Sequence, residues 1–364
     1  MKPASAAQRV RDRGIVETAR MRIGVVTPLE TEWAARIIAA AGHNEVWFQP
    51  RLLPAPRYPS DHRGDPSFAR SPADDASFWH EVAQCEILYG GPGDTAAGLA
   101  RAIASAPKLR WVQGTAAGAG EQVRAAALAP EVFARIAFTS AAGVHGGMLA
   151  EFIFFGLLAL RKDARRLERI RAERRWDHYA MGELDGSSIA IVGMGSIGRA
   201  IASRARAFGM QVFAVTRSGV GSSEVDGAFS TAGMPEAFRR ADAVAVTLPA
   251  TEQTHGLVDR AALDALRPSA IFCNVGRGSV VDQAALAEKL SAGAIAGAVL
   301  DVCDPEPLPP EHPLWSLPNV IFAPHTAALS VHENERIVEL FCDNLQRFEA
   351  GLPLRNRIDA REFY

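Results

Sequence analysis

The chain has 364 residues, of which 48% are apolar and 22% charged, a composition typical of packed globular proteins and long enough for two domains. Its 39 basic and 41 acidic residues give a net charge of -2, which argues against general adhesion to nucleic acid or to an anionic membrane. The four cysteines form no CxxC pair, so neither a zinc motif nor a redox motif is expected, and reduced thiols suggest a cytoplasmic protein.

The N-terminal half begins with a polar, arginine-rich stretch over residues 1–20, which lacks the apolar core of a signal peptide and predicts a disordered or frayed tail. Short apolar runs then alternate with segments of helical spacing, for example at 30–41 and 99–104. The pattern predicts strands at 22–26, 45–48, 86–89, 109–113 and 135–139.

Three segments interrupt this alternation. Residues 50–72 are rich in proline, arginine and aspartate, which predicts a long loop that is either functional or disordered. The apolar stretch at 148–160 is shorter than the roughly 20 residues that span a bilayer, so a helix packed inside the protein is expected. Residues 161–175 hold eight basic and three acidic side chains, and a solvated helix end is favoured over a nucleic-acid patch.

A second alternating series follows. It predicts strands at 188–192, 212–215, 243–248, 270–274, 298–302 and 320–323, then a C-terminal helix at 333–348 that could return to the first domain. Strands that alternate with helices indicate parallel sheets. We therefore expect an α/β protein with two Rossmann-like or flavodoxin-like parallel-sheet domains separated by a cleft.

A glycine turn, GMGSIG at 193–198, lies between a predicted strand and a predicted helix. In a dinucleotide-binding turn, Gly193 would permit the tight bend, Gly195 would let a pyrophosphate approach the backbone, and Gly198 would let helix and strand pack closely. The free N–H groups of the helix N-terminus would bind the phosphates. Residues 145–325 are therefore expected to form the dinucleotide-binding domain, with 21–144 plus 326–364 as the substrate-binding domain.

The end of the second strand in this series predicts the type of cofactor. NAD-binding folds place an acidic residue there for the ribose 2′-hydroxyl, but this chain has Thr216, Arg217 and Ser218. Arginine forms charge-assisted pairs with phosphate, and the two hydroxyls can add hydrogen bonds. The pattern favours NADP over NAD, with NAD still possible.

Three polar residues lie at or after later strand ends, where open α/β sheets bind ligands: Arg277, Glu306 and His325. The guanidinium fork of arginine matches a carboxylate, and histidine can transfer a proton near neutral pH. A glutamate on the other imidazole nitrogen would fix the tautomer and raise the histidine pKa. The set suits hydride transfer at a 2-oxo or 2-hydroxy acid.

These motifs resemble the D-isomer-specific 2-hydroxyacid dehydrogenases, and especially their glyoxylate/hydroxypyruvate reductases. The resemblance runs from about residue 22 to the C-terminus. Two features depart from the family pattern, namely Thr216 in place of an acidic residue and the 50–72 loop, which has no clear counterpart. The resemblance is carried by the 193–198 turn, Thr247-Leu248-Pro249 with Thr254, 274–278, 300–306, Pro324-His325, and 143–147 followed by Ala150-Glu151.

The resemblance also implies roles for individual residues. Arg277, Glu306 and His325 would be catalytic, Ser196 and Ile197 would lie under the cofactor phosphates, and a homodimer is implied. Backbone loops at Gly90, Gly91, Ala117, Gly118 and Ala119 would bind the substrate carboxylate together with Arg277. Further cofactor contacts would come from Leu248, Pro249, Thr254, Val275, Gly276 and Asp301, the last three on the nicotinamide side.

The sequence thus predicts an NADP(H)-preferring reductase that converts a glyoxylate- or hydroxypyruvate-like 2-oxo acid to the D-2-hydroxy acid. Formate oxidation is disfavoured because Glu306 stands where formate dehydrogenases of this family carry glutamine. Two alternatives stay open. One is a dinucleotide-sensing, corepressor-like regulator with little or no turnover, and the other is a methyltransferase or other Rossmann enzyme that would not need the three polar residues together.

Overall fold

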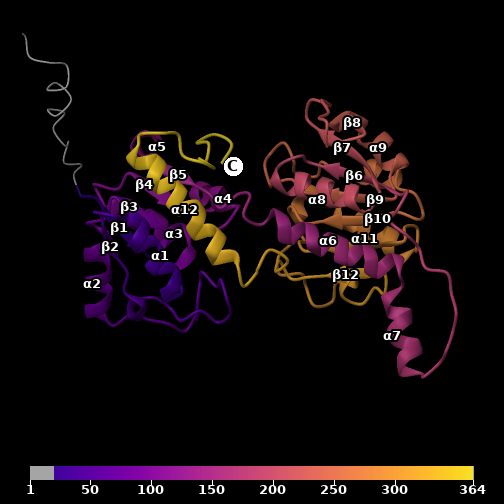
Figure 1. Ribbon diagram of the computed structural model, residues 1–364, viewed down its shortest axis with the longest axis horizontal. Coiled ribbons are helices and arrows are strands. Elements are labelled where there is room, and N and C mark those ends of the chain that lie inside the picture. Colours follow the sequence, from indigo (N-terminus) through magenta and orange to yellow (C-terminus); the bar gives the residue numbers. More distant parts are fainter. Residues whose placement is uncertain (1–19, 364) are drawn as a thin grey trace, which may run out of the picture.

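The computed structural model describes residues 20–363. Its first half contains a parallel five-stranded sheet in the order β2-β1-β3-β4-β5 (Figure 1). The expected tail at 1–20 falls almost entirely outside the described residues. The strands are β1 (Arg22–Val25), β2 (Glu45–Trp47), β3 (Ile87–Tyr89), β4 (Trp111–Gln113) and β5 (Ala137–Thr139), and the helices are α1 (Thr31–Ala41), α2 (Pro72–Val82), α3 (Ala96–Ser105), α4 (Ala119–Ala125) and α5 (Pro130–Arg135).

The second half is a parallel seven-stranded sheet in the order β12-β11-β10-β9-β6-β7-β8. Its strands are β6 (Ser188–Val192), β7 (Gln211–Thr216), β8 (Gly227–Ser230), β9 (Ala243–Val246), β10 (Ile271–Asn274), β11 (Gly297–Leu300) and β12 (Val320–Phe322). Its helices are α6 (Gly146–Arg161), α7 (Ala164–Ala172), α8 (Ser196–Ala207), α9 (Met234–Arg240), α10 (Arg260–Asp264) and α11 (Gln283–Ser291), and the chain continues into α12 (Glu333–Glu349).

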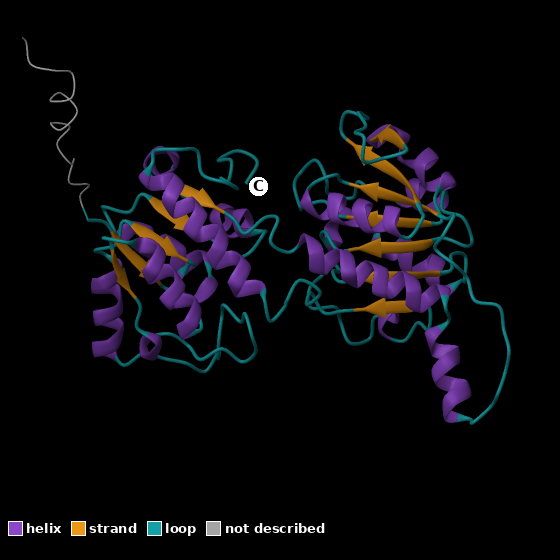
Figure 2. Cartoon of the chain, viewed as in Figure 1, coloured by secondary structure: helices purple, strands orange, loops and turns teal. Residues whose placement is uncertain are grey.

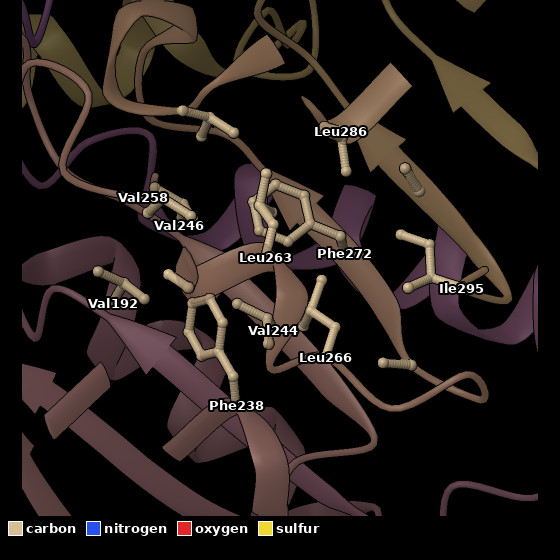
Figure 3. Close-up of a cluster of buried hydrophobic side chains, with 14 of the residues drawn as sticks. Val192, Phe238, Val244, Val246, Val258, Leu263, Leu266, Phe272, Leu286 and Ile295 are labelled. Carbon is tan, nitrogen blue, oxygen red and sulfur yellow. The ribbon is translucent and has the colours of Figure 1, made fainter. Parts of the chain in front are cut away.

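Helices cover both faces of each sheet (Figure 2), so the central strands are apolar on both sides. The strands β9 and β10 are buried at every position, which explains why they are continuous apolar runs rather than alternating ones. On one face Phe238, Phe272 and Leu263 are fully buried and pack with the strand residues (Figure 3). Full burial of one such side chain contributes about 1.5–3 kcal/mol.

The C-terminal helix α12 packs on the first half, beside α1. Phe341 stacks on Trp111 with ring centroids 4.9 Å apart and meets Tyr89 edge to face. The core of the first half therefore includes residues from both ends of the chain. The domain boundaries at 144 and 326 stay a prediction.

Several elements were not anticipated from the sequence. The edge strand β8 consists of Gly-Ala-Phe-Ser, is only half-buried and pairs with β7 alone, so it lacks the apolar run of an internal strand. Helices α2, α5, α9 and α10 are short or weakly amphipathic. The long loop ends where the Ser71 hydroxyl accepts from Asp74 N and caps α2.

The apolar stretch at 148–160 lies in α6, which packs against α8 and β11 as expected for a helix inside the protein. Among residues 20–363, no helix has the length and hydropathy needed to cross a bilayer. The basic segment at 161–175 forms the end of α6 and the exposed helix α7.

Candidate active site

The glycine turn connects β6 to α8 in a conformation that requires glycine. Gly193 has φ of 101°, a region that residues with a β-carbon rarely adopt. A β-carbon on Gly198 would lie 2.1 Å from the carbonyl oxygen of Gly193, so only hydrogen fits there. Gly195 is the N-cap of the twelve-residue helix α8, and the space where its β-carbon would lie is open. This turn fits a dinucleotide pyrophosphate, whose phosphates would meet the free N–H groups of Ser196 and Ile197.

The end of β7 presents a free cation beside this turn. Arg217 is exposed, and among residues 20–363 its guanidinium has no hydrogen bond or ion pair. The Thr216 hydroxyl accepts from Gly219 N at 3.1 Å, and the Ser218 hydroxyl accepts from Val220 N at 3.4 Å. The loop is thus shaped by its own hydroxyls and leaves Arg217 available to a phosphate.

A cavity of about 660 Å³ lies between the two halves and receives residues from both. From the second half come Ile197, Thr247, Leu248, Pro249, Val275, Gly276, Arg277, Asp301, Glu306 and His325. From the first half come Ala117, Gly118, Glu121, Asp94 and residues of the 50–72 loop. All three predicted catalytic side chains therefore line one cavity.

Arg277 is placed by a tight turn after β10. The Asn274 side chain accepts from Gly276 N and donates from Nδ2 to the Arg277 carbonyl, both at 3.0 Å. A β-carbon on Gly276 would lie 2.5 Å from the Leu248 carbonyl oxygen, so the turn packs directly on the neighbouring backbone. This arrangement directs the guanidinium toward the first half, where its Nε donates to Glu121 Oε1 at 2.8 Å.

His325 and Glu306 form a hydrogen-bonded pair in the lining of the same cavity. His325 Nδ1 lies 2.8 Å from Glu306 Oε2, while Glu306 Oε1 accepts from Cys303 N at 3.1 Å. The carboxylate is therefore fixed by the backbone at one oxygen and orients the imidazole with the other. Because Nδ1 is engaged, Nε2 is the ring nitrogen available to a substrate.

Asp301 holds the turn that carries His325. Its side chain is buried, and Oδ1 accepts from the backbone N–H groups of Thr326 and Ala327, each at 2.9 Å. Burial raises the pKa of this carboxyl, and the two backbone donors oppose that shift. Asp301 also lines the cavity, so it can both support the turn and face a bound cofactor.

The 50–72 loop, which the sequence left open between functional and disordered, contributes Arg57, Tyr58 and the 60–63 segment to the cavity wall. Its centre is the buried carboxylate of Asp61, which accepts from Arg57 Nε at 2.6 Å and Nη2 at 3.0 Å, and also from the N–H groups of Arg63 and Gly64. The Arg57 hydrogen bonds hold the pKa of Asp61 well below its ordinary value. The loop is thus an ordered part of the site.

A second histidine–carboxylate pair, His145 with Glu333, was missed by the sequence analysis. His145 Nε2 lies 2.9 Å from Glu333 Oε1, both side chains are buried, and both residues line the cavity. His145 is the N-cap of α6 and Glu333 begins α12, so the pair joins the two segments that pass between the halves. His145 lies within the 143–147 segment that carries the resemblance, but the sequence analysis assigned it no role. Glu121 was missed as well, because it lies in no recognisable motif.

Other predicted site residues lie away from the cavity lining. Thr254 donates to the Pro249 carbonyl at 2.6 Å and accepts from Thr251 N, so it shapes the loop that carries Pro249. Gly90, with φ of 83°, packs on Thr27, and Gly91 packs near Gln122. Ala119 is buried at the start of α4. No metal-binding cluster of His, Cys, Asp or Glu is found within the described part of the chain, residues 20–363.

Comparison with known proteins identifies the group to which this fold and site belong. Residues 154–327 match the family model of the D-isomer specific 2-hydroxyacid dehydrogenase NAD binding domain. Glyoxylate reductase of Korarchaeum cryptofilum is 35% identical over 219 residues, which cover 58% of this chain and 66% of that relative.

Solved structures match over nearly the whole chain. A D-isomer specific 2-hydroxyacid dehydrogenase family protein of Aeromonas salmonicida superposes with a TM-score of 0.75 at 27% identity, covering 94% of this chain and 99% of that one. A D-isomer specific 2-hydroxyacid dehydrogenase of Xanthobacter autotrophicus Py2, in complex with NADPH and MES, gives 0.74 at 26% identity, covering 95% and 100%.

The fold and the site define a two-domain oxidoreductase with a nicotinamide-dinucleotide-binding domain. More specifically, the chain belongs to the D-isomer-specific 2-hydroxyacid dehydrogenase family.

Proposed function

We propose that this chain is an NADP(H)-preferring reductase of small 2-oxo acids of the glyoxylate and hydroxypyruvate class, with the D-2-hydroxy acid as product. The observation that carries the proposal is the convergence of Arg277, Glu306 and His325 on one cavity next to the glycine turn. The glyoxylate reductase among the relatives supports the substrate class.

In this mechanism the Arg277 guanidinium binds the substrate carboxylate and holds the 2-oxo group toward His325. The bound nicotinamide would supply the hydride to C2 of the substrate. His325 donates the proton from Nε2 to the developing alkoxide oxygen. Glu306 keeps Nδ1 protonated and stabilises the imidazolium before the transfer, and solvent reprotonates the ring afterwards.

The preference for NADP(H) is supported by the free guanidinium of Arg217 at the end of β7 and by the lack of a carboxylate at that strand end. A ribose 2′-phosphate would form charge-assisted hydrogen bonds with Arg217. A 2′-hydroxyl would gain little from the same residue. This reasoning agrees with the NADPH bound to the Xanthobacter relative.

A homodimer and a cytoplasmic location complete the proposal. Helix α7 projects from the second half (Figure 1). In the segment that follows it, Trp176 is 90% exposed. Tryptophan is enriched at protein interfaces, and a second copy of this chain is the proposed partner. All four cysteines are unpaired thiols, as suits a reducing compartment.

Steady-state oxidation of NADPH and NADH with a panel of 2-oxo acids tests the function. We expect turnover with glyoxylate or hydroxypyruvate and a higher kcat/KM with NADPH. A protein that binds NADPH tightly but turns over no member of the panel would contradict the enzymatic proposal and favour a dinucleotide-sensing regulator.

A further inference from the structure

Arg277 already has a carboxylate partner before any substrate is present. Its Nε donates to Glu121 Oε1 at 2.8 Å, and its Nη1 donates to the Gly276 carbonyl at 2.8 Å. Its Nη2 lies over Gly118, where a β-carbon would approach it to 2.3 Å. Glu121 belongs to α4 of the first half, so this ion pair crosses the cavity between the halves.

We propose that Glu121 competes with the substrate carboxylate for Arg277 and thereby sets the affinity of the site for anionic 2-oxo acids. The inference rests on the proposed function, in which Arg277 binds that carboxylate. Glu121 is a positioning residue, since it acts through Arg277 rather than on the reacting atoms.

The donor geometry of Arg277 explains the competition. A carboxylate binds an arginine best through two parallel N–H groups along one edge of the fork. Glu121 occupies Nε, so the Nε/Nη2 edge lacks one of its two donors, and Nη1 already donates one N–H to the Gly276 carbonyl. A substrate carboxylate that uses the Nε/Nη2 edge must therefore displace Glu121.

The displacement is easy because the Glu121 side chain is 46% exposed and can turn toward solvent. Ion pairs of this exposure change an equilibrium by about five-fold at most. The competition for Arg277 weakens substrate binding, while the contact between Arg277 and the bound substrate, and hence kcat, stays the same.

The test replaces Glu121 by glutamine, which keeps the size of the side chain and removes its charge. Glu131→Gln is the matched control, because Glu131 is an exposed glutamate on α5 that does not line the cavity. The measurements are KM and kcat for glyoxylate with NADPH, and the Kd of oxamate, a 2-oxo acid analogue that is not reduced, by calorimetry on the NADPH-bound protein.

We expect Glu121→Gln to lower both the KM for glyoxylate and the Kd of oxamate by about two- to five-fold, with kcat changed by less than about two-fold. Glu131→Gln should leave all three values unchanged. Unchanged or higher KM and Kd in Glu121→Gln, or a kcat that falls in parallel, would overturn the inference.

Oxamate binding separates this inference from the proposed function. If the wild-type chain reduces no 2-oxo acid, the proposed function fails, yet the oxamate comparison still tests the competition. In an Arg277→Ala background, Glu121→Gln should no longer change oxamate affinity. A gain of affinity in that background would show a general charge effect and would also overturn the inference.

Discussion

His325 has a left-handed backbone conformation, with φ of 52°, although it carries a β-carbon. Such a conformation costs on the order of 1–3 kcal/mol and persists where the surroundings enforce it. Here His325 N donates to the Asp301 carbonyl at 2.8 Å, and the Asp301 side chain accepts from the next two residues. The backbone therefore fixes the position of the imidazole, as the proposed role of His325 as a proton donor requires.

The first residue-scale prediction concerns this imidazole. His325→Asn should lower kcat by about 10²- to 10⁴-fold, because the amide cannot transfer a proton, while the Kd of NADPH stays the same. Stopped-flow or steady-state kinetics and fluorescence titration of NADPH measure the two quantities. The control is His332→Asn, since His332 is exposed beside Glu335 and does not line the cavity. A His325→Asn protein with wild-type kcat would exclude His325 as the acid.

The second residue-scale prediction concerns the cofactor. Arg217→Ala should raise the KM for NADPH by about ten-fold or more and leave the KM for NADH unchanged, because only NADPH carries the 2′-phosphate that the guanidinium would bind. Arg206→Ala provides the comparison, since Arg206 is another exposed arginine of this half and pairs with Asp226. Equal effects on both cofactors would mean that Arg217 does not recognise the phosphate.

Among the elements, the 50–72 loop shows most clearly where sequence reasoning ends. Its proline, arginine and aspartate content predicted a loop, but it did not predict order. The order comes from Asp61, whose buried carboxylate accepts from Arg57, Arg63 and Gly64, and from Ser60, which donates to the Ser330 carbonyl at 3.1 Å. The bond between Ser60 and Ser330 joins residues far apart in the chain, so no local sequence pattern predicts it.

This loop should lose order in acid. Because the folded-state pKa of Asp61 lies below its ordinary value of 3.8, its stabilisation is complete above about pH 4 and is lost as the pH falls below that value. Asp61→Asn should remove the contribution, on the order of 1–3 kcal/mol, at every pH. Hydrogen exchange of residues 57–64 measures the change.

The corresponding control is Asp65→Asn, since Asp65 lies in the same loop but its side chain accepts hydrogen bonds from the nearby, exposed Ser67. It should leave the exchange of the loop nearly unchanged. If the amides of residues 57–64 exchange as slowly in Asp61→Asn as in the wild type at neutral pH, Asp61 is not what orders the loop.

Most elements of both sheets could be predicted because each strand and helix is a local pattern of apolar residues. The turns at 193–198 and 274–278 could also be predicted, since each is a local glycine-containing motif that follows a predicted strand. Contacts between distant residues could not: Glu121 and Arg277 are 156 positions apart, and His145 and Glu333 are 188 apart. Such pairs follow from how the two halves meet, which the local sequence does not specify.

At the scale of the whole molecule, the proposed dimer depends on the projecting segment around α7. Trp176→Ala should shift the protein toward the monomer, because it removes the most exposed large apolar side chain among the described residues. Analytical ultracentrifugation at several concentrations measures the shift. Trp315→Ala is the comparison, since Trp315 is 50% exposed but packs against Phe322 of its own chain. A wild-type protein that is monomeric throughout would refute the dimer.

The return of α12 to the first half has a consequence for synthesis on the ribosome. Asn344 donates from Nδ2 to Gln113 Oε1, across 231 positions, and Phe341 covers Trp111 inside the same core. The seven-stranded sheet is complete when residue 322 has been made, whereas the five-stranded sheet, although translated earlier, still lacks one wall of its core. The half that is translated first is therefore the half that must wait for the last helix before it can close.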